Sequence, residues 1–155
     1  MEIRRAQKED LGGLVRLLCQ VLEVHHKGRP DLFRTGTRKY TDEEILEILS
    51  DPERPVFVAV ESGEVLGYAF CVLESTENSA VFYPVRSLYL DDLCVDETRR
   101  GKHIGKALYD HVCAFAKQEG CYHVTLNVWS LNESAVAFYQ KCGMKPLKIG
   151  METIL

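Results

Sequence analysis

Helical and strand-like periodicities alternate along the whole chain, and this alternation limits the folds that the sequence can adopt. Apolar residues at helical spacing predict four helices, over 11–22, 41–51, 104–116 and 132–142. Alternating or continuous β-rich runs predict strands around Ile3 and over 56–60, 65–73, 87–95, 122–129 and 147–151. The order β-α-α-β-β-β-α-β-α-β indicates an α+β protein whose mixed sheet is covered by helices.

The 155 residues suit one compact domain, residues 1–155, because no repeat, linker or low-complexity tract divides them. A net charge of −4 argues against a nucleic-acid partner. No stretch approaches the roughly 18 apolar residues of a membrane span. The six cysteines form no CxxC pair and have no nearby histidine at metal-ligand spacing, so we expect no metal site. These features predict a cytoplasmic protein with reduced thiols.

The most informative segment joins the strand ending at Val95 to the helix starting at Ile104 through a basic turn that contains glycine. Free backbone N–H groups at a helix N-terminus, together with the helix dipole, favour a bound anion such as phosphate. A Walker A loop is excluded, because Gly101 and Gly105 are one residue too close and Ala107 replaces the required hydroxyl. The dinucleotide fingerprint GxGxxG is also absent.

Two motifs resemble those of the GNAT superfamily of N-acetyltransferases. Arg100-Gly-Lys-His-Ile-Gly105 resembles the family's acetyl-CoA loop, Arg/Gln-x-x-Gly-x-Gly/Ala. Leu131-Asn-Glu-Ser-Ala-Val-Ala-Phe-Tyr-Gln-Lys-Cys-Gly-Met144 resembles the family's Asn-x-x-Ala-x-x-Phe-Tyr-x-x-x-Gly segment. The resemblance covers about Ser87 to Met144 and implies a mostly antiparallel sheet, split in a V between the fourth and fifth strands, with helices on both faces.

The resemblance also implies where acetyl-CoA binds. Its pantetheine arm is expected to pair with the backbone of Leu93, Cys94 and Val95, and its pyrophosphate to lie in a loop formed by Arg100, Gly101, Lys102, His103, Ile104, Gly105 and Lys106. His103 departs from the family pattern, because the motif usually has its first glycine there. We expect its imidazole either to turn outward or to donate a hydrogen bond to a phosphate oxygen.

Acetyl transfer to an amine requires a base, an oxyanion donor and an acid for the departing thiolate. Tyr139 matches the family's general acid, although its helix face also suits a core aromatic. Asn132 matches the asparagine near the thioester and also suits a helix N-cap. By the resemblance, the oxyanion is held by the main-chain N–H of Leu93 or Val95.

Asp91 and Asp92 interrupt an otherwise apolar strand. Tyr89-Leu-Asp-Asp-Leu-Cys-Val95 resembles the Tyr-Leu-Glu-Asp-x-x-Val of spermidine/spermine acetyltransferases, in which acidic residues bind or deprotonate the amine. Because successive strand side chains point to opposite faces, at most one aspartate is expected to face the substrate, Asp91 first and Asp92 second. The alternative is a solvated aspartate beside one paired with arginine.

Three further residues are assigned by position alone. His25 and His26 follow the first predicted helix, where the family often has a substrate-binding loop, and Trp129 ends the fifth predicted strand. Solvent-exposed histidines and a packed tryptophan explain the same pattern.

The sequence thus predicts an acetyl-CoA-dependent N-acetyltransferase that acts by direct transfer in a ternary complex on a primary amine, with a small cationic amine expected in an acidic pocket. Two alternatives remain, a non-catalytic acyl-CoA-sensing module and a protein or peptide N-acetyltransferase. The apolar residues Ile149, Met151, Ile154 and Leu155 suit either a homodimer interface or the completion of the sheet.

Overall fold

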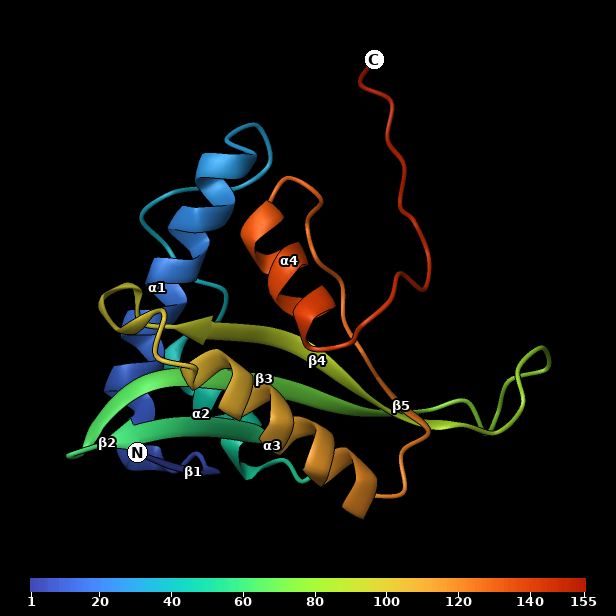
Figure 1. Ribbon diagram of the computed structural model, residues 1–155, viewed down its shortest axis with the longest axis horizontal. Helices are drawn as coiled ribbons and strands as arrows, with labels where there is room; N and C mark the ends of the chain where they lie inside the picture. The colour runs from blue at the N-terminus through green and yellow to red at the C-terminus, as the bar shows by residue number, and fades with distance from the viewer.

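The computed structural model describes residues 1–155 and contains five strands and four α-helices in one sheet-based architecture (Figure 1). In chain order the elements are β1 (Glu2–Arg5), α1 (Leu11–Gly28), α2 (Asp42–Ser50), β2 (Val56–Glu61), β3 (Glu64–Ser75), β4 (Arg86–Val95), α3 (Ile104–Gln118), β5 (His123–Thr125) and α4 (Glu133–Lys141). Short 3-10 turns precede α1 and follow β4. No helix is both long and apolar enough to cross a membrane.

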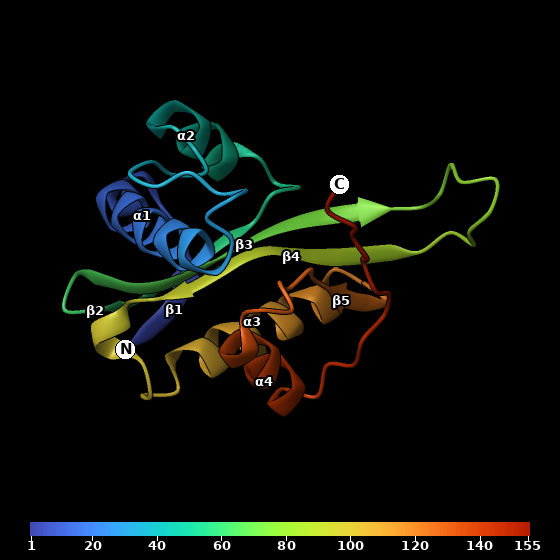
Figure 2. The same ribbon diagram turned by 90° about the horizontal axis from the view of Figure 1, so that it is seen from above.

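The sheet has the strand order β1-β2-β3-β4-β5 and separates two hydrophobic cores. Figure 2 shows α1 and α2 on one face of the sheet and α3 and α4 on the other. One core joins α1 and α2 to the sheet around Leu14, Ile45 and Tyr68. The other joins α3 to the sheet around Leu88 and Leu108. The predicted mixed sheet with helices on both faces is confirmed.

The split in the sheet follows from the shortness of β5. Neighbouring strands β1 to β4 are antiparallel, whereas β5 runs parallel to β4 and pairs only with Ser87, Leu88 and Tyr89. Beyond Tyr89, β4 continues to Val95 with β3 on one side and no strand on the other. The sheet therefore opens in a V between β4 and β5, as predicted.

A β-bulge lies in the middle of β4, where the split begins. Phe70 of β3 pairs with Asp92, whereas the next residue, Cys71, pairs with Leu90, so that Asp91 is left over. An extra residue in one strand of an antiparallel pair breaks the alternation of side chains between the two faces. The bulge therefore decides where both aspartates point.

Three sequence-based expectations about the elements are wrong. The segment 147–151 forms no strand, because it has no strand partner and no backbone hydrogen bond of the chain extends beyond Met144. The fifth strand is limited to His123–Thr125 instead of 122–129. His25 and His26 do not follow the first helix; they lie in its last turn, since α1 continues to Gly28.

Candidate active site

Asp91 and Asp92 point to the same side of the sheet because of the bulge, contrary to the expected opposite faces. Asp91 Oδ2 accepts hydrogen bonds from Lys39 Nζ and Tyr40 Oη, both at 2.7 Å. Asp92 Oδ2 accepts one from Tyr68 Oη at 2.9 Å. Tyr68 and Tyr40 both belong to the core on the α1 and α2 face. The alternative of one aspartate paired with arginine is not found, because the partners are a lysine and two tyrosines.

The environment of Asp92 shifts its pKa clearly from the usual value of an aspartate. Burial raises the pKa of Asp92 to about 6, against the lowering effects of the Tyr68 hydrogen bond and of Lys39. The main-chain N–H of Leu93 also donates to this carboxylate and acts in the same lowering direction. A carboxylate that titrates near neutrality is suited to accept a proton.

Tyr139 reaches the split from α4 on the other side of the sheet. Its ring packs on Phe138 at 5.1 Å and on Tyr109 at 6.4 Å between centroids. Burial raises the pKa of Tyr139, and the nearby charge of Asp92 raises it further. Its hydroxyl makes no hydrogen bond within the protein and is not completely shielded from solvent. A phenol of this kind stays protonated at neutral pH and is free to donate.

The open edge of β4 offers main-chain donors. Asp96 N–H donates to Leu66 O of β3, and N–H groups alternate between the two sides of a strand, so those of Leu93 and Val95 face the split. Cys94 turns its thiol to the carbonyl of Leu17 in the α1 core. Of the three strand residues predicted to bind coenzyme, Val95 therefore offers a free main-chain donor, Leu93 offers one that also contacts the Asp92 carboxylate, and the thiol of Cys94 points elsewhere.

The loop between β4 and α3 adopts the backbone conformation that glycine usually provides. Gly101 has φ +78° and His103 has φ +60° with ψ +12°, both in the left-handed region. Histidine is among the residues that tolerate this region, at a cost of roughly 1–2 kcal/mol. The position at which His103 departs from the family motif thus keeps the glycine-like backbone.

The first turn of α3 is open to an anion. His103 is the N-cap residue but makes no side-chain capping hydrogen bond, so the first N–H groups of the helix remain free. Arg100 and Lys102 are exposed beside them. Lys106 is already bound to Asp110, with N–O distances of 2.7 and 2.6 Å, and the pKa of Lys106 is raised by that contact. At Gly105, an added Cβ would lie 3.4 Å from the ring of Phe138, an ordinary contact.

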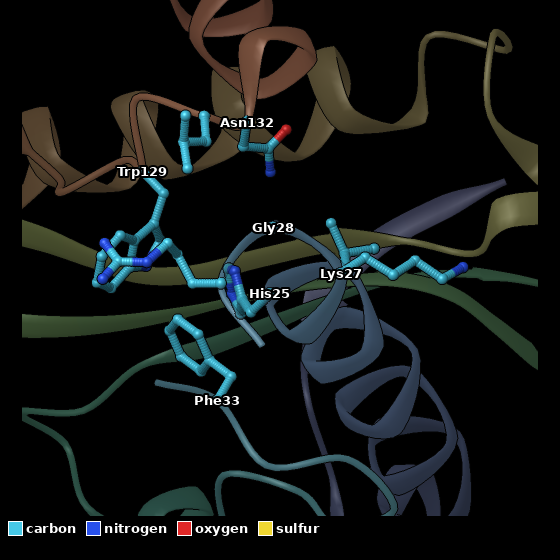
Figure 3. Close-up of a pocket in the computed structure, with 9 residues that line it drawn as sticks. His25, Lys27, Gly28, Phe33, Trp129 and Asn132 are labelled. Atoms are coloured by element: carbon cyan, nitrogen blue, oxygen red, sulfur yellow. The ribbon is translucent and has the colours of Figure 1, made fainter. Parts of the chain in front are cut away.

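A cavity of about 230 Å³ lies between the end of α1 and the segment that leads into α4. Figure 3 shows His25 and Phe33 on one side of it and Trp129 and Asn132 on the other. Phe33 stacks on His25 and meets Trp129 edge-on, with centroids 5.1 and 5.2 Å apart. Asn132 caps α4 by accepting a hydrogen bond from Ala135 N at 3.2 Å, which leaves its NH₂ group free on the cavity side.

Comparison with known proteins adds independent evidence to this geometry. Residues 20–144 match the family described as "Acetyltransferase (GNAT) family". The chain belongs to the GNAT family of acetyltransferases. It is 27% identical over 146 residues to the peptidyl-lysine N-acetyltransferase YjaB of Escherichia coli, covering 94% of this chain and 82% of that protein.

Other relatives point to the same family. The thialysine N-epsilon-acetyltransferase of Bos taurus is 26% identical over 155 residues, covering 94% of this chain and 84% of its own. The crystal structure of a mutant of the BH1408 protein of Bacillus halodurans superposes with a TM-score of 0.95, at 31% identity, over 100% of this chain and 99% of that one. The protein is accordingly an N-acetyltransferase with the GNAT fold.

The sequence did not reveal the residues that hold the two aspartates. Lys39 and Tyr40 lie in the loop before α2, about fifty residues from Asp91 in the chain, and Tyr68 lies on the neighbouring strand. No local motif marks them. The only available signal for Tyr68 is a polar group in an otherwise apolar buried strand, because a buried tyrosine hydroxyl needs a partner.

Proposed function

We propose that this GNAT protein transfers an acetyl group from acetyl-CoA to a primary amine by direct attack within a ternary complex. The observation that carries the proposal is the open edge of β4, which leads from the bulge at Asp91 directly to the uncapped first turn of α3. Free strand donors followed by a free helix N-terminus suit an extended chain that ends in a pyrophosphate.

The coenzyme is expected to lie along this edge. Of the N–H groups of Leu93 and Val95, on either side of Cys94, one would pair with its pantetheine arm and the other would face the thioester carbonyl. The loop Arg100 to Lys106 would surround the pyrophosphate, with exposed cations and the free N–H groups of Ile104 and Gly105. The free NH₂ group of Asn132 lies on the α4 side of the same opening.

Asp92 is the residue best suited to take a proton from the amine. With its pKa at about 6, Asp92 is ionised at neutral pH yet basic enough to accept a proton. Asp91 already accepts two hydrogen bonds and holds the loop before α2 against β4. This reverses the order expected from the sequence and makes Asp91 a positioning residue.

These groups account for each proton that moves during the transfer. The amine nitrogen gives a proton to Asp92 and forms the new C–N bond with the thioester carbonyl carbon. The carbonyl oxygen gains negative charge, which the N–H of Leu93 or Val95 stabilises. The C–S bond then breaks, and the thiolate takes the proton of the Tyr139 hydroxyl.

Mass spectrometry of products formed from acetyl-CoA with amino acids, diamines, aminoglycosides and lysine peptides tests the proposal. We expect an acetylated amine with the wild type and a loss of roughly 10²-fold or more in kcat with Tyr139→Phe. Tyr109→Phe is the matched control, because Tyr109 packs beside Tyr139 on α3 and should remain active. Coenzyme binding without product from any amine would contradict the proposal and favour an acyl-CoA-sensing module.

A further inference from the structure

The cavity beside α1 has a cationic wall that the reaction itself does not require. Its lining includes Lys27 and Arg29, together with His25 and the aromatic rings, and contains no carboxylate. The two cations differ in their partners: Arg29 is paired with carboxylates from outside the lining, whereas Lys27 forms no ion pair.

The side chain of Arg29 binds two carboxylates within the protein. Its side chain is only 14% exposed. Its Nε and Nη2 donate to the two oxygens of Asp31 at 2.9 and 2.7 Å. Its Nη1 and Nη2 donate to the two oxygens of Glu152 at 2.5 and 3.2 Å. The guanidinium group thus binds two carboxylates in the forked geometry that distinguishes arginine from lysine.

Glu152 is the more replaceable of these two carboxylates. It is 58% exposed and lies in the C-terminal segment, which has no helix or strand and no backbone hydrogen bond after Met144. A group on such a tether acts at an effective concentration in the millimolar range. A free carboxylate at millimolar concentration therefore competes with Glu152 for the same N–H groups.

The cavity and the carboxylate pair on β4 are close together. The pKa of His25 in the cavity wall is lowered by burial and by the positive charge of Lys39. Lys39 in turn binds Asp91 at 2.7 Å. Asn132, on the opposite wall, begins the helix that carries Tyr139. Lys39 therefore lies between the cavity wall and the carboxylates of β4.

We propose that Arg29 binds a carboxylate of the acceptor, so that the substrate is an amine that also carries a carboxylate, as a free amino acid does. Glu152 occupies Arg29 until the acceptor displaces it. The proposal rests on the proposed function for the amine end of the acceptor and adds the recognition of its other end. Arg29 is then a specificity-determining residue.

Two acceptors that differ only in the carboxylate provide the test. Lysine and 1,5-diaminopentane share the same terminal amine, and we expect kcat/KM for lysine to be higher by about tenfold or more, as for a charge-assisted hydrogen bond. Arg29→Gln should remove this preference and leave the diamine unchanged. Glu152→Gln should lower KM for lysine only. Arg34→Gln, an exposed arginine of the same loop, is the matched control.

A binding measurement separates this proposal from the proposed reaction. Calorimetric titration with lysine and with 1,5-diaminopentane, in wild type and Arg29→Gln, reports carboxylate binding even where no acetyl group is transferred. An equal loss of affinity for lysine and for 1,5-diaminopentane in Arg29→Gln would overturn the proposal. Glucosamine 6-phosphate and glucosamine form a second pair of acceptors. If only the preference for glucosamine 6-phosphate over glucosamine depended on Arg29, the site would bind phosphate, and the proposal would be overturned as well.

Discussion

Replacing Asp92 by Asn is expected to stabilise the folded protein at neutral pH while it lowers activity. The pKa of Asp92 is raised by burial from 3.8 to about 6, a difference of about two units. Each unit corresponds to about 1.4 kcal/mol, so keeping the ionised carboxylate in the fold costs about 3 kcal/mol well above pH 6. Asparagine carries no charge and avoids that cost.

The sign of the pH dependence follows from the direction of the shift. Because the pKa of Asp92 is higher in the folded state, its favourable contribution is complete below pH 3.8 and is lost as the pH rises through about 6. The stability of Asp92→Asn relative to wild type should therefore increase by about 1.4 kcal/mol between pH 5 and pH 8. Groups shared by both proteins cancel in this difference.

Denaturant unfolding of both proteins at several pH values measures the difference directly. Asp96→Asn is the control, because hydrogen bonding to Thr98 and to Arg16 lowers the pKa of Asp96 to about 2. Asp96 stays ionised in the folded and the unfolded state from pH 5 to pH 8. The free energy of unfolding of Asp96→Asn should therefore lie below that of the wild type by the same amount at every pH in this range. A constant difference for Asp92→Asn as well would refute the raised pKa of Asp92.

The activity of the same variant completes the prediction. If Asp92 accepts the proton of the amine, kcat/KM of the wild type should fall below about pH 6, and Asp92→Asn should lose roughly 10²-fold or more in kcat. A variant that is more stable yet less active would show that the buried charge is kept for function. Full activity would transfer the role of base to another group.

Three further predictions concern the fold, and denaturant titration measures each. Gly13→Ala should be less stable than Gly12→Ala by about 1 to 3 kcal/mol, because its new Cβ would lie 2.6 Å from Val65 Cβ whereas Gly12 has open space; equal effects would contradict the packing of α1 on β3. His103→Gly should stabilise the protein by about 0.5 to 1 kcal/mol by relieving its left-handed backbone, and a loss of stability would argue against that conformation. Thr41→Ala should cost about 1 kcal/mol, because Thr41 caps α2, and an unchanged midpoint would contradict the capping box.

Features specified by local sequence were predicted well. The box from Thr41 to Glu44 begins α2, and Asn132 caps α4, because each side chain binds backbone groups within three residues of itself. The turn at Ser62 and Gly63, with positive φ at both residues, joins β2 to β3 as the sequence indicated. Signals of this kind need no knowledge of the rest of the chain.

The orientation of the two aspartates required information that the local sequence lacks. Simple alternation places Asp91 and Asp92 on opposite faces, but the register between β3 and β4 leaves Asp91 unpaired. That register depends on the packing of both strands between two layers of helices. The partners Lys39 and Tyr40 reach Asp91 only because the loop before α2 folds back across β4.

Alternation of apolar residues also failed at the C-terminal end. The segments 122–129 and 147–151 both alternate, yet only His123–Thr125 pairs with another strand. A strand exists only where a neighbour accepts its hydrogen bonds, and the sequence does not say where that neighbour lies. Leu147, Ile149 and Met151 consequently remain exposed.

Because β5 pairs with β4 over only three residues, the part of the chain after α3 is weakly attached to the rest of the sheet. The segment that carries Tyr139 and Asn132 is held to the sheet by three paired residues and by side chains that pack only partly buried against the core, and α4 has no fully buried side chain. Amide hydrogens of β5 and α4 should therefore exchange faster than those of β2 and β3 in the free protein. A ligand that bridges the two halves would slow that exchange in proportion to its affinity. Binding of the ligand would then also hold Tyr139, the proposed general acid, in place.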